Sequence, residues 1–183
     1  MLDVRPLELE GVLEVLPHRH RDERGFFSET FSSQGLAARG VNATFVQDNH
    51  SFSAAAGVLR GLHYQLPPQA QAKLVRVVRG RIFDVAVDIR RRSPNFGKWV
   101  GLEVSAERWN QIFVPVGFAH GFVTLEPHTE VIYKVTDYYS AVHDRSILFD
   151  DPAIGIDWPI DKARVMLSAK DRAAPLLLQA TVF

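Results

Sequence analysis

The middle of this chain is a succession of short strand-like segments separated by Gly, Pro, Asn and Ser, and this pattern constrains the fold more than any other feature. The seven central segments are residues 58–65, 72–78, 81–89, 98–104, 111–114, 121–125 and 130–136. An eighth segment lies at residues 25–31, and short helices are expected only at residues 32–39 and 161–164. Many short strands at near-regular spacing, with few helices, predict an all-β antiparallel sandwich or barrel.

Composition limits the kind of protein that this fold can serve. A length of 183 residues predicts one domain over residues 1–183, and a net charge of zero disfavours a global attraction to nucleic acid or to a membrane surface. The absence of cysteine excludes disulfides, thiolate metal sites and cysteine nucleophiles. No signal-peptide pattern and no apolar run of about 18 residues is found, so we expect a soluble, cytoplasmic protein.

Ionisable side chains interrupt three of the strand-like pieces. Residues 57–65 carry Arg60 and His63, with Lys73 soon after; residues 115–122 carry His120; and residues 131–139 carry two tyrosines. Polar groups on a core strand are costly unless they hold a ligand or do chemistry. Each could instead be a hydrogen-bonded core residue or an edge charge. Together they indicate one pocket for proton transfer, with the reaction undefined by these residues alone.

Strand alternation decides which of these side chains can share the pocket. Tyr133 and Tyr139 have the same parity, so both can line one interior, at most roughly 20 Å apart. Arg60 and His63 have opposite parity and would face opposite sides of a regular strand. A β-bulge at Gly61 would reconcile them, because a glycine inside a strand often marks a bulge.

A metal site is considered because the Pro-x-Gly-x-x-His pattern ending at His120 resembles the second motif of the cupin superfamily. The first cupin motif needs a His-x-His pair and a nearby Glu. Here Gln65 replaces the second His, and no carboxylate lies between it and Lys73. Two histidines and an ammonium group make a poor divalent site, so we predict the barrel without a metal.

Taken together, the motifs resemble those of the dTDP-4-dehydrorhamnose 3,5-epimerase family. They are DERGFFSE (22–29), QDNHS (47–51), GVLRGLHYQ (57–65), KLV (73–75), FDVAVDIR (83–90), SPNFG (93–97), PVGFAHGF (115–122), YK (133–134), YY (138–139), DDPAIGIDWP (150–159) and LSAKD (167–171). They follow the family order over nearly the whole chain. The resemblance implies a cupin-type antiparallel β-barrel, or jelly roll, with a few short helices.

The resemblance also implies the catalytic roles. His63 would be the base that removes the proton beside the C4 ketone, and a neutral imidazole is suited to this at physiological pH. Asp171 would orient His63 and stabilise its imidazolium. Tyr133 would return a proton to the opposite face of the sugar ring. Lys73 would stabilise the enolate oxygen.

Binding positions are implied in the same way. Arg24 and Arg60 match positions that hold the diphosphate or sugar, where guanidinium groups suit phosphate oxygens. Tyr139 matches an aromatic residue that stacks on thymine, and His120 matches a sugar contact, with Asp84 as its expected partner. The other implied binding residues, at the thymidine end or the sugar, are Glu29, Gln47, Asp48, Asn49, Asp144 and Lys170. Gln47 and Asn49 could instead be loop-capping residues.

One segment departs from the family. Ser-Ala-Val at residues 140–142 replaces a commonly seen Pro-Glu, which leaves the nucleotide-end contacts open, including any role of Asp144.

The implied function is cofactor-independent epimerisation of dTDP-4-keto-6-deoxy-D-glucose at C3 and C5, giving dTDP-4-keto-L-rhamnose, by a homodimeric enzyme. Three alternatives remain open: an epimerase acting on one carbon, a 3,4-ketoisomerase of the same fold, and a catalytically silent sugar-nucleotide-binding cupin. The set of His63, Lys73, Tyr133 and Asp171 argues against the silent binder.

Overall fold

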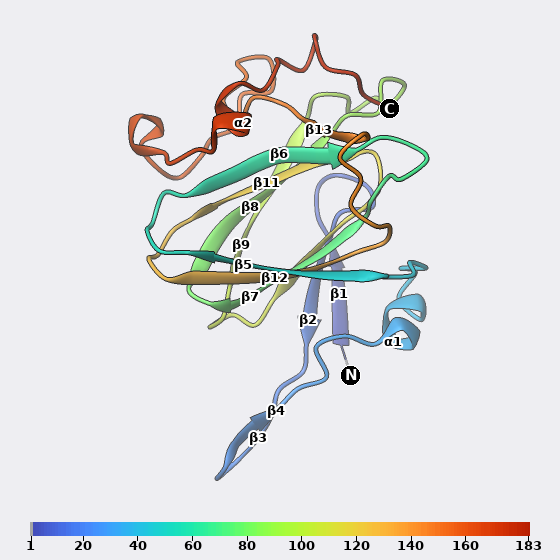
Figure 1. Cartoon of the computed structure of the whole chain (residues 1–183). Coiled ribbons are helices and arrows are strands. Elements are labelled where there is room, and N and C mark those ends of the chain that lie inside the picture. Colours follow the sequence, from blue (N-terminus) through green and yellow to red (C-terminus); the bar gives the residue numbers. More distant parts are fainter. Residues whose placement is uncertain (1) are drawn as a thin grey trace.

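Two antiparallel sheets dominate the computed structural model, which describes residues 2–183 (Figure 1). The six-stranded sheet has the order β1 (Leu2–Pro6), β2 (Leu13–Pro17), β10 (Gln111–Val114), β7 (Lys73–Arg79), β12 (Thr129–Val135) and β5 (Gln47–Ser53). The five-stranded sheet has the order β13 (Asp144–Ser146), β6 (Leu59–Gln65), β11 (Phe118–Thr124), β8 (Arg81–Asp88) and β9 (Trp99–Ser105). A separate hairpin pairs β3 (His20–Asp22) with β4 (Gly25–Phe27).

The two sheets face each other across a core to which alternate residues of each strand contribute. Val75 and Val77 of one sheet pack in the same cluster as Ile82, Phe118 and Phe122 of the other. Side chains two apart on a strand point to the same side, so each strand contributes alternate residues to this core. Two antiparallel sheets packed face to face confirm the predicted cupin-type antiparallel fold.

Each sheet is also covered on its outer face. The carboxyl-terminal third supplies Phe149 and Trp158 against outward residues of β6 and β8, such as Leu62 and Val85. On the other sheet, helix α1 (Ser33–Ala37) packs Leu36 in a further cluster, and the Ser32 hydroxyl accepts a hydrogen bond from the Gly35 amide to cap it. Each sheet thus has an apolar cover on its outer face in addition to the core between the sheets.

All seven central segments form strands close to the predicted positions. Residues 25–31 were predicted as one strand, but only Gly25–Phe27 is extended within a sheet, as β4. Residues 161–164 form a 3₁₀ turn at Lys162–Arg164 (η1), capped by Asp161. The prediction missed β5 because Gln47–Ser53 is polar. It also missed the strands β1, β2, β3 and β13 and the short helix α2 (Ala169–Arg172).

The predicted bulge at Gly61 is present in strand β6. His63 pairs with His120 and Arg60 pairs with Phe122, so β6 has one residue more than β11 between the two pairs. Gly61 has φ +143°, and a Cβ there would lie 2.5 Å from the Cα of Gly121. Only glycine fits this approach, and the extra residue turns Arg60 and His63 toward the same cavity.

Within residues 2–183, no helix has both the length and the apolar character that crossing a membrane requires.

Candidate active site

Most of the predicted site residues meet in a cavity with two lobes between the sheets. The Tyr139 lobe, of about 290 Å³, and the His120 lobe, of about 230 Å³, share His63, Lys73, Tyr133 and Lys170. A hollow of about 300 Å³ elsewhere is lined by Ala56, Gly57, Ile160, Asp161 and Arg164. Because that hollow has no His, Lys or Tyr in its lining, the two-lobed cavity is the candidate active site.

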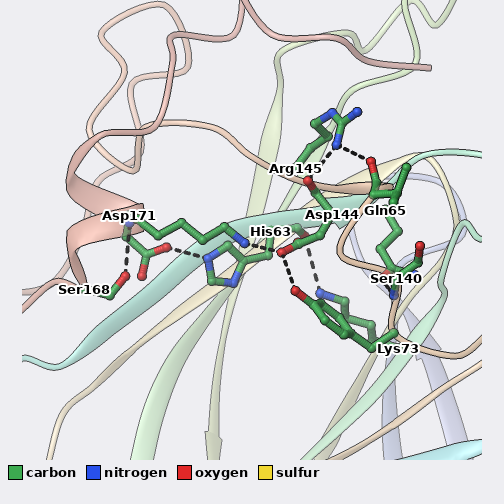
Figure 2. A network of polar contacts seen from close by, with 11 residues as sticks. His63, Gln65, Lys73, Ser140, Asp144, Arg145, Ser168 and Asp171 are labelled. Atoms are coloured by element: carbon green, nitrogen blue, oxygen red, sulfur yellow. Dashed lines mark hydrogen bonds and ion pairs between the residues drawn. The ribbon is translucent and has the colours of Figure 1, made fainter.

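His63 and Asp171 form a close pair at the junction of the lobes (Figure 2). The Nε2 atom of His63 lies 2.5 Å from Oδ1 of Asp171, which α2 carries to the side of β6. Burial is the largest single influence and opposes ionisation of Asp171, but the hydrogen bond and charge of His63, with Ser168 and Lys170, together outweigh it and lower the pKa of this carboxyl. An ionised Asp171 keeps the proton of a neutral His63 on Nε2, which leaves Nδ1 as the basic nitrogen.

Tyr133 enters the cavity from the opposite sheet. It lies on β12 beside Val75 of β7 and Asn49 of β5, whereas His63 lies on β6. Burial raises the pKa of Tyr133 above its ordinary value, so the phenol remains protonated at neutral pH. An imidazole base and a phenol acid therefore line one cavity from two different sheets.

Lys73 is buried between them, at the start of β7. Its Nζ atom donates to the backbone carbonyl of His63 at 3.3 Å. Burial lowers the pKa of Lys73 to about 8, against the opposing effect of the carboxylates of Asp84 and Asp144. A buried ammonium group is well suited to stabilise a developing oxyanion.

His120 and Asp84 form a second His–carboxylate pair, deeper in the sandwich. Nε2 of His120 lies 2.9 Å from both carboxylate oxygens of Asp84, a residue with no exposed surface. The expected partnership of these two residues is thus confirmed.

The Tyr139 lobe is a ring of polar groups at the mouth of the cavity. Its edge is formed by Tyr139, whose hydroxyl donates to Asp144 at 3.3 Å and whose backbone amide donates to Gln47. Lys170 also donates to Asp144, and Gln47 donates to Asn49. Tyr139 was expected to lie on the same strand as Tyr133. Strand β12 ends at Val135, however, so Tyr139 reaches the lobe from the loop that follows the strand.

Three predicted binding residues lie outside the cavity of their own chain. Asp48 alternates with Gln47 and Asn49 on β5, so it faces outward and forms an ion pair with Lys134 at 2.8 Å. Arg24 is exposed in the β3–β4 hairpin and forms an ion pair with Asp22 at 2.6 Å. Glu29 is exposed in the segment that follows the hairpin.

Several cavity residues were not identified from the sequence. Ser51 lines the His120 lobe, and its buried hydroxyl has no hydrogen-bond partner within residues 2–183. Phe122 and Ser168 line the same lobe. Ser51 has the same parity as Asn49, so recognition of β5 as a strand would have indicated it.

The residues of the apparent cupin motifs do not form a metal site. Gln65 uses its amide nitrogen to donate to the carbonyls of Gln69 and Tyr138, and its amide oxygen accepts from the amide of Ser140. In the part of the chain that the structure describes, no three His, Cys, Asp or Glu side chains cluster as metal ligands would. Gln65, at the position of the second histidine ligand in the cupin motif, thus binds the loop that contains Tyr138 and Ser140.

Comparison with known proteins gives consistent matches over the whole chain. The sequence model of the dTDP-4-dehydrorhamnose 3,5-epimerase family matches residues 6–179. The enzyme of that name from Salmonella typhimurium is 52% identical over 181 residues, which are 98% of each chain.

Solved structures agree with these sequence matches. An epimerase from Legionella pneumophila in complex with dTDP-4-keto-L-rhamnose superposes with a TM-score of 0.94 and 45% identity, over 99% of this chain and 95% of that one. A 3′-monoepimerase from Streptomyces bikiniensis in complex with dTDP-quinovose gives a TM-score of 0.86 and 35% identity, over 94% and 87%.

Proposed function

Since the chain belongs to the dTDP-4-dehydrorhamnose 3,5-epimerase family, we propose that it converts dTDP-4-keto-6-deoxy-D-glucose to dTDP-4-keto-L-rhamnose by inverting C3 and C5. The observation that carries this proposal is the position of His63 and Tyr133, which line one cavity from opposite sheets. Inversion of a carbon needs proton removal on one side of the ring and proton delivery on the other, which a single group cannot provide.

The proposed reaction proceeds through an enolate. Nδ1 of His63 takes the proton from the carbon beside the ketone, and the electron pair of that C–H bond moves into the ring, giving an enolate oxygen at C4. Asp171 stabilises the resulting imidazolium, and the ammonium of Lys73 stabilises the enolate oxygen. Tyr133 then protonates the carbon from the opposite side as the enolate collapses back to the ketone. The imidazolium of His63 releases its proton to solvent, and the phenolate of Tyr133 takes one up.

The Tyr139 lobe is proposed to bind the dTDP moiety. The exposed ring of Tyr139 can stack on thymine. Lys170, which both lobes share, and Arg60 of the neighbouring His120 lobe provide cationic groups for the diphosphate. Gln47 and Asn49 supply amide groups in the same lobe.

The positions of Arg24 and Glu29 support a homodimer. The β3–β4 hairpin extends away from the sandwich (Figure 1), and its Phe26 and Phe27 are 49% and 72% exposed. Such large exposed aromatic side chains are typical of interaction surfaces. We propose that the hairpin of one chain packs against a second chain and brings Arg24 and Glu29 to the partner's cavity.

Complementation tests this arrangement. Inactive Arg24→Ala and His63→Ala chains, unfolded and refolded together, should recover activity because a mixed dimer contains one intact cavity. Each variant refolded alone is the control. Light scattering that gives a monomer, or mixed chains that stay inactive, would contradict the exchange of hairpins.

We further propose that residues 1–183 act as one domain in the cytoplasm. Strand β1 near the amino terminus and strand β13 at Asp144–Ser146 each join one of the two sheets, and a cysteine-free protein needs no oxidising compartment.

An epimerase acting on one carbon is the second candidate, because a 3′-monoepimerase has a closely similar structure. The experiment that separates the candidates is incubation with dTDP-4-keto-6-deoxy-D-glucose in D₂O, followed by NMR. Deuterium with inversion at C3 and C5 supports the proposal, and inversion at one carbon supports the second candidate. Movement of the ketone to C3 would indicate a ketoisomerase, and an unchanged substrate a silent binder.

A further inference from the structure

More basic side chains than carboxylates line the cavity, and both of the lining carboxylates already have close partners. Asp171 contacts His63, and Asp144 contacts Lys170 and Tyr139. Asp84 is the remaining carboxylate close to the cavity, and it lies behind His120 and near Lys73. The mechanism above gives it no task, although a fully buried carboxylate is costly to maintain.

The contact between Asp84 and His120 has the geometry of a carboxylate accepting one N–H group. Nε2 of His120 is 2.9 Å from Oδ1 and 2.9 Å from Oδ2 of Asp84, so the nitrogen lies evenly between the two oxygens. A protonated carboxyl donates through one oxygen, whereas an ionised one accepts with both. Burial raises the pKa of Asp84, and the charge of His120, its hydrogen bond to Asp84 and the charge of Lys73 oppose this rise.

We propose that Asp84 is a positioning residue that fixes the proton of His120 on Nε2 and keeps the ammonium of Lys73 charged beside the reacting sugar. This inference rests on the proposed function, in which Lys73 stabilises the enolate. With Asp84 anionic and Lys73 cationic, a neutral His120 makes the three groups electrically neutral before the substrate reacts. Burial lowers the pKa of His120, which favours this neutral form.

Each part of the arrangement has a consequence for the substrate. A neutral His120 with its proton on Nε2 presents Nδ1 as an acceptor, so it suits a sugar hydroxyl and not a second oxyanion. Lys73 is then the charged donor for the enolate. Asp84 thus separates the tasks of two neighbouring basic side chains without touching the sugar.

The charge of Lys73 depends on every ionisable group packed around it. These groups come from six other elements: Asp84 on β8, His120 on β11, His63 on β6, Tyr133 on β12, Asp144 on β13, and Lys170 and Asp171 on α2. Asp84 and Asp144 raise the pKa of Lys73, and Lys170 lowers it. Of these two carboxylates, Asp84 raises the pKa of Lys73 more, and its hydrogen-bond partner is the buried side chain of His120.

The first test needs neither substrate nor a variant. In the ligand-free protein at neutral pH, long-range ¹H–¹⁵N NMR spectra should show the proton of His120 on Nε2. A proton on Nδ1 would mean that Asp84 is itself protonated and donates to Nε2, and would overturn the proposal.

The second test is a ¹³C NMR titration of the lysine side chains in the ligand-free protein. Asp84→Asn should lower the pKa of Lys73 by ~1–3 units, the usual effect of an opposite charge at short range. The matched control is Asp88→Asn on the same strand, since Asp88 is equally buried but is bound by Arg90 and Ser93. The control should leave the titration of Lys73 unchanged, and an unchanged pKa in Asp84→Asn as well would overturn the proposal.

A third measurement separates this inference from the proposed function. If the wild type exchanges no sugar proton for deuterium, the proposed function fails while the NMR results on Asp84 still stand. If the wild type is active, the alkaline limit of kcat in Asp84→Asn should move ~1–3 pH units lower, with KM changed less than twofold. An alkaline limit identical to that of the wild type would overturn the role of Asp84 alone.

Discussion

His63 and Tyr133 belong to different sheets and line the same cavity, His63 from β6 and Tyr133 from β12. The sandwich holds the two groups on separate rigid frameworks, so neither can take the place of the other. This relationship leads to direct expectations for substitutions at each position.

His63→Ala should reduce turnover by ~10²–10⁴-fold or more, because removal of a general base typically costs this much. The affinity for dTDP should be retained, since Tyr139 and Lys170 remain. Steady-state kinetics and calorimetry with dTDP provide the measurements. Near-native turnover in this variant would disprove the role of His63 as the base. Asp171→Asn should be impaired as well, through loss of the orientation of His63.

Tyr133→Phe keeps the ring but removes the proton donor. His63 should still form the enolate, and reprotonation from its own side restores the original configuration. In D₂O this variant should therefore incorporate deuterium beside the ketone faster than it forms inverted product, as followed by NMR. Inversion at the wild-type rate would remove Tyr133 from the role of acid.

Tyr139→Ala should weaken dTDP binding by ~1–3 kcal/mol, the usual contribution of a base stacked on an aromatic ring. Tyr138→Ala is the matched control, because both tyrosines are 61% exposed but only Tyr139 lines the cavity. Calorimetric titration with dTDP measures both. Equal losses in the two variants would argue against a specific stacking role.

The alkaline limit of activity should follow Lys73, whose pKa burial lowers to about 8. The active form carries a protonated Lys73, so on the alkaline side of its optimum kcat should fall as the pH rises through this value. Lys73→Met, which cannot titrate, should be slow at all pH values and lose this limit. A wild-type rate that stays constant up to pH 10 would contradict the assignment.

Activity should survive exhaustive chelation, because Gln65 and Lys73 occupy positions where a metal cupin needs ligands. Elemental analysis of the purified protein should show no stoichiometric metal. Activity that is lost on chelation and restored by zinc, iron or manganese would disprove the acid–base mechanism.

The sequence predicted the fold class well because strand alternation is a local property. Residues two apart share a side of a strand whatever lies next to it, so the shared cavity of His63, Lys73, His120 and Tyr133 followed from parity and one bulge. Strand β5 escaped because its residues are mostly polar, and hydrophobic periodicity detects only strands that contribute apolar residues to a core. With β5 unrecognised, Ser51 was missed and Asp48 was wrongly grouped with its neighbours.

By itself, the sequence determined the set of reactive side chains, the strands that carry His63, Lys73 and Tyr133, and the family to which the chain belongs. The tertiary structure decided which of them meet. His63 and Asp171 are separated by 108 positions, and only the packing of α2 beside β6 brings them to 2.5 Å. The tertiary structure also leaves Arg24 and Glu29 outside the cavity and places Asp84 behind His120. The physical reason is that alternation and turns act over a few residues, whereas the choice of neighbouring strands depends on burial summed over the whole chain.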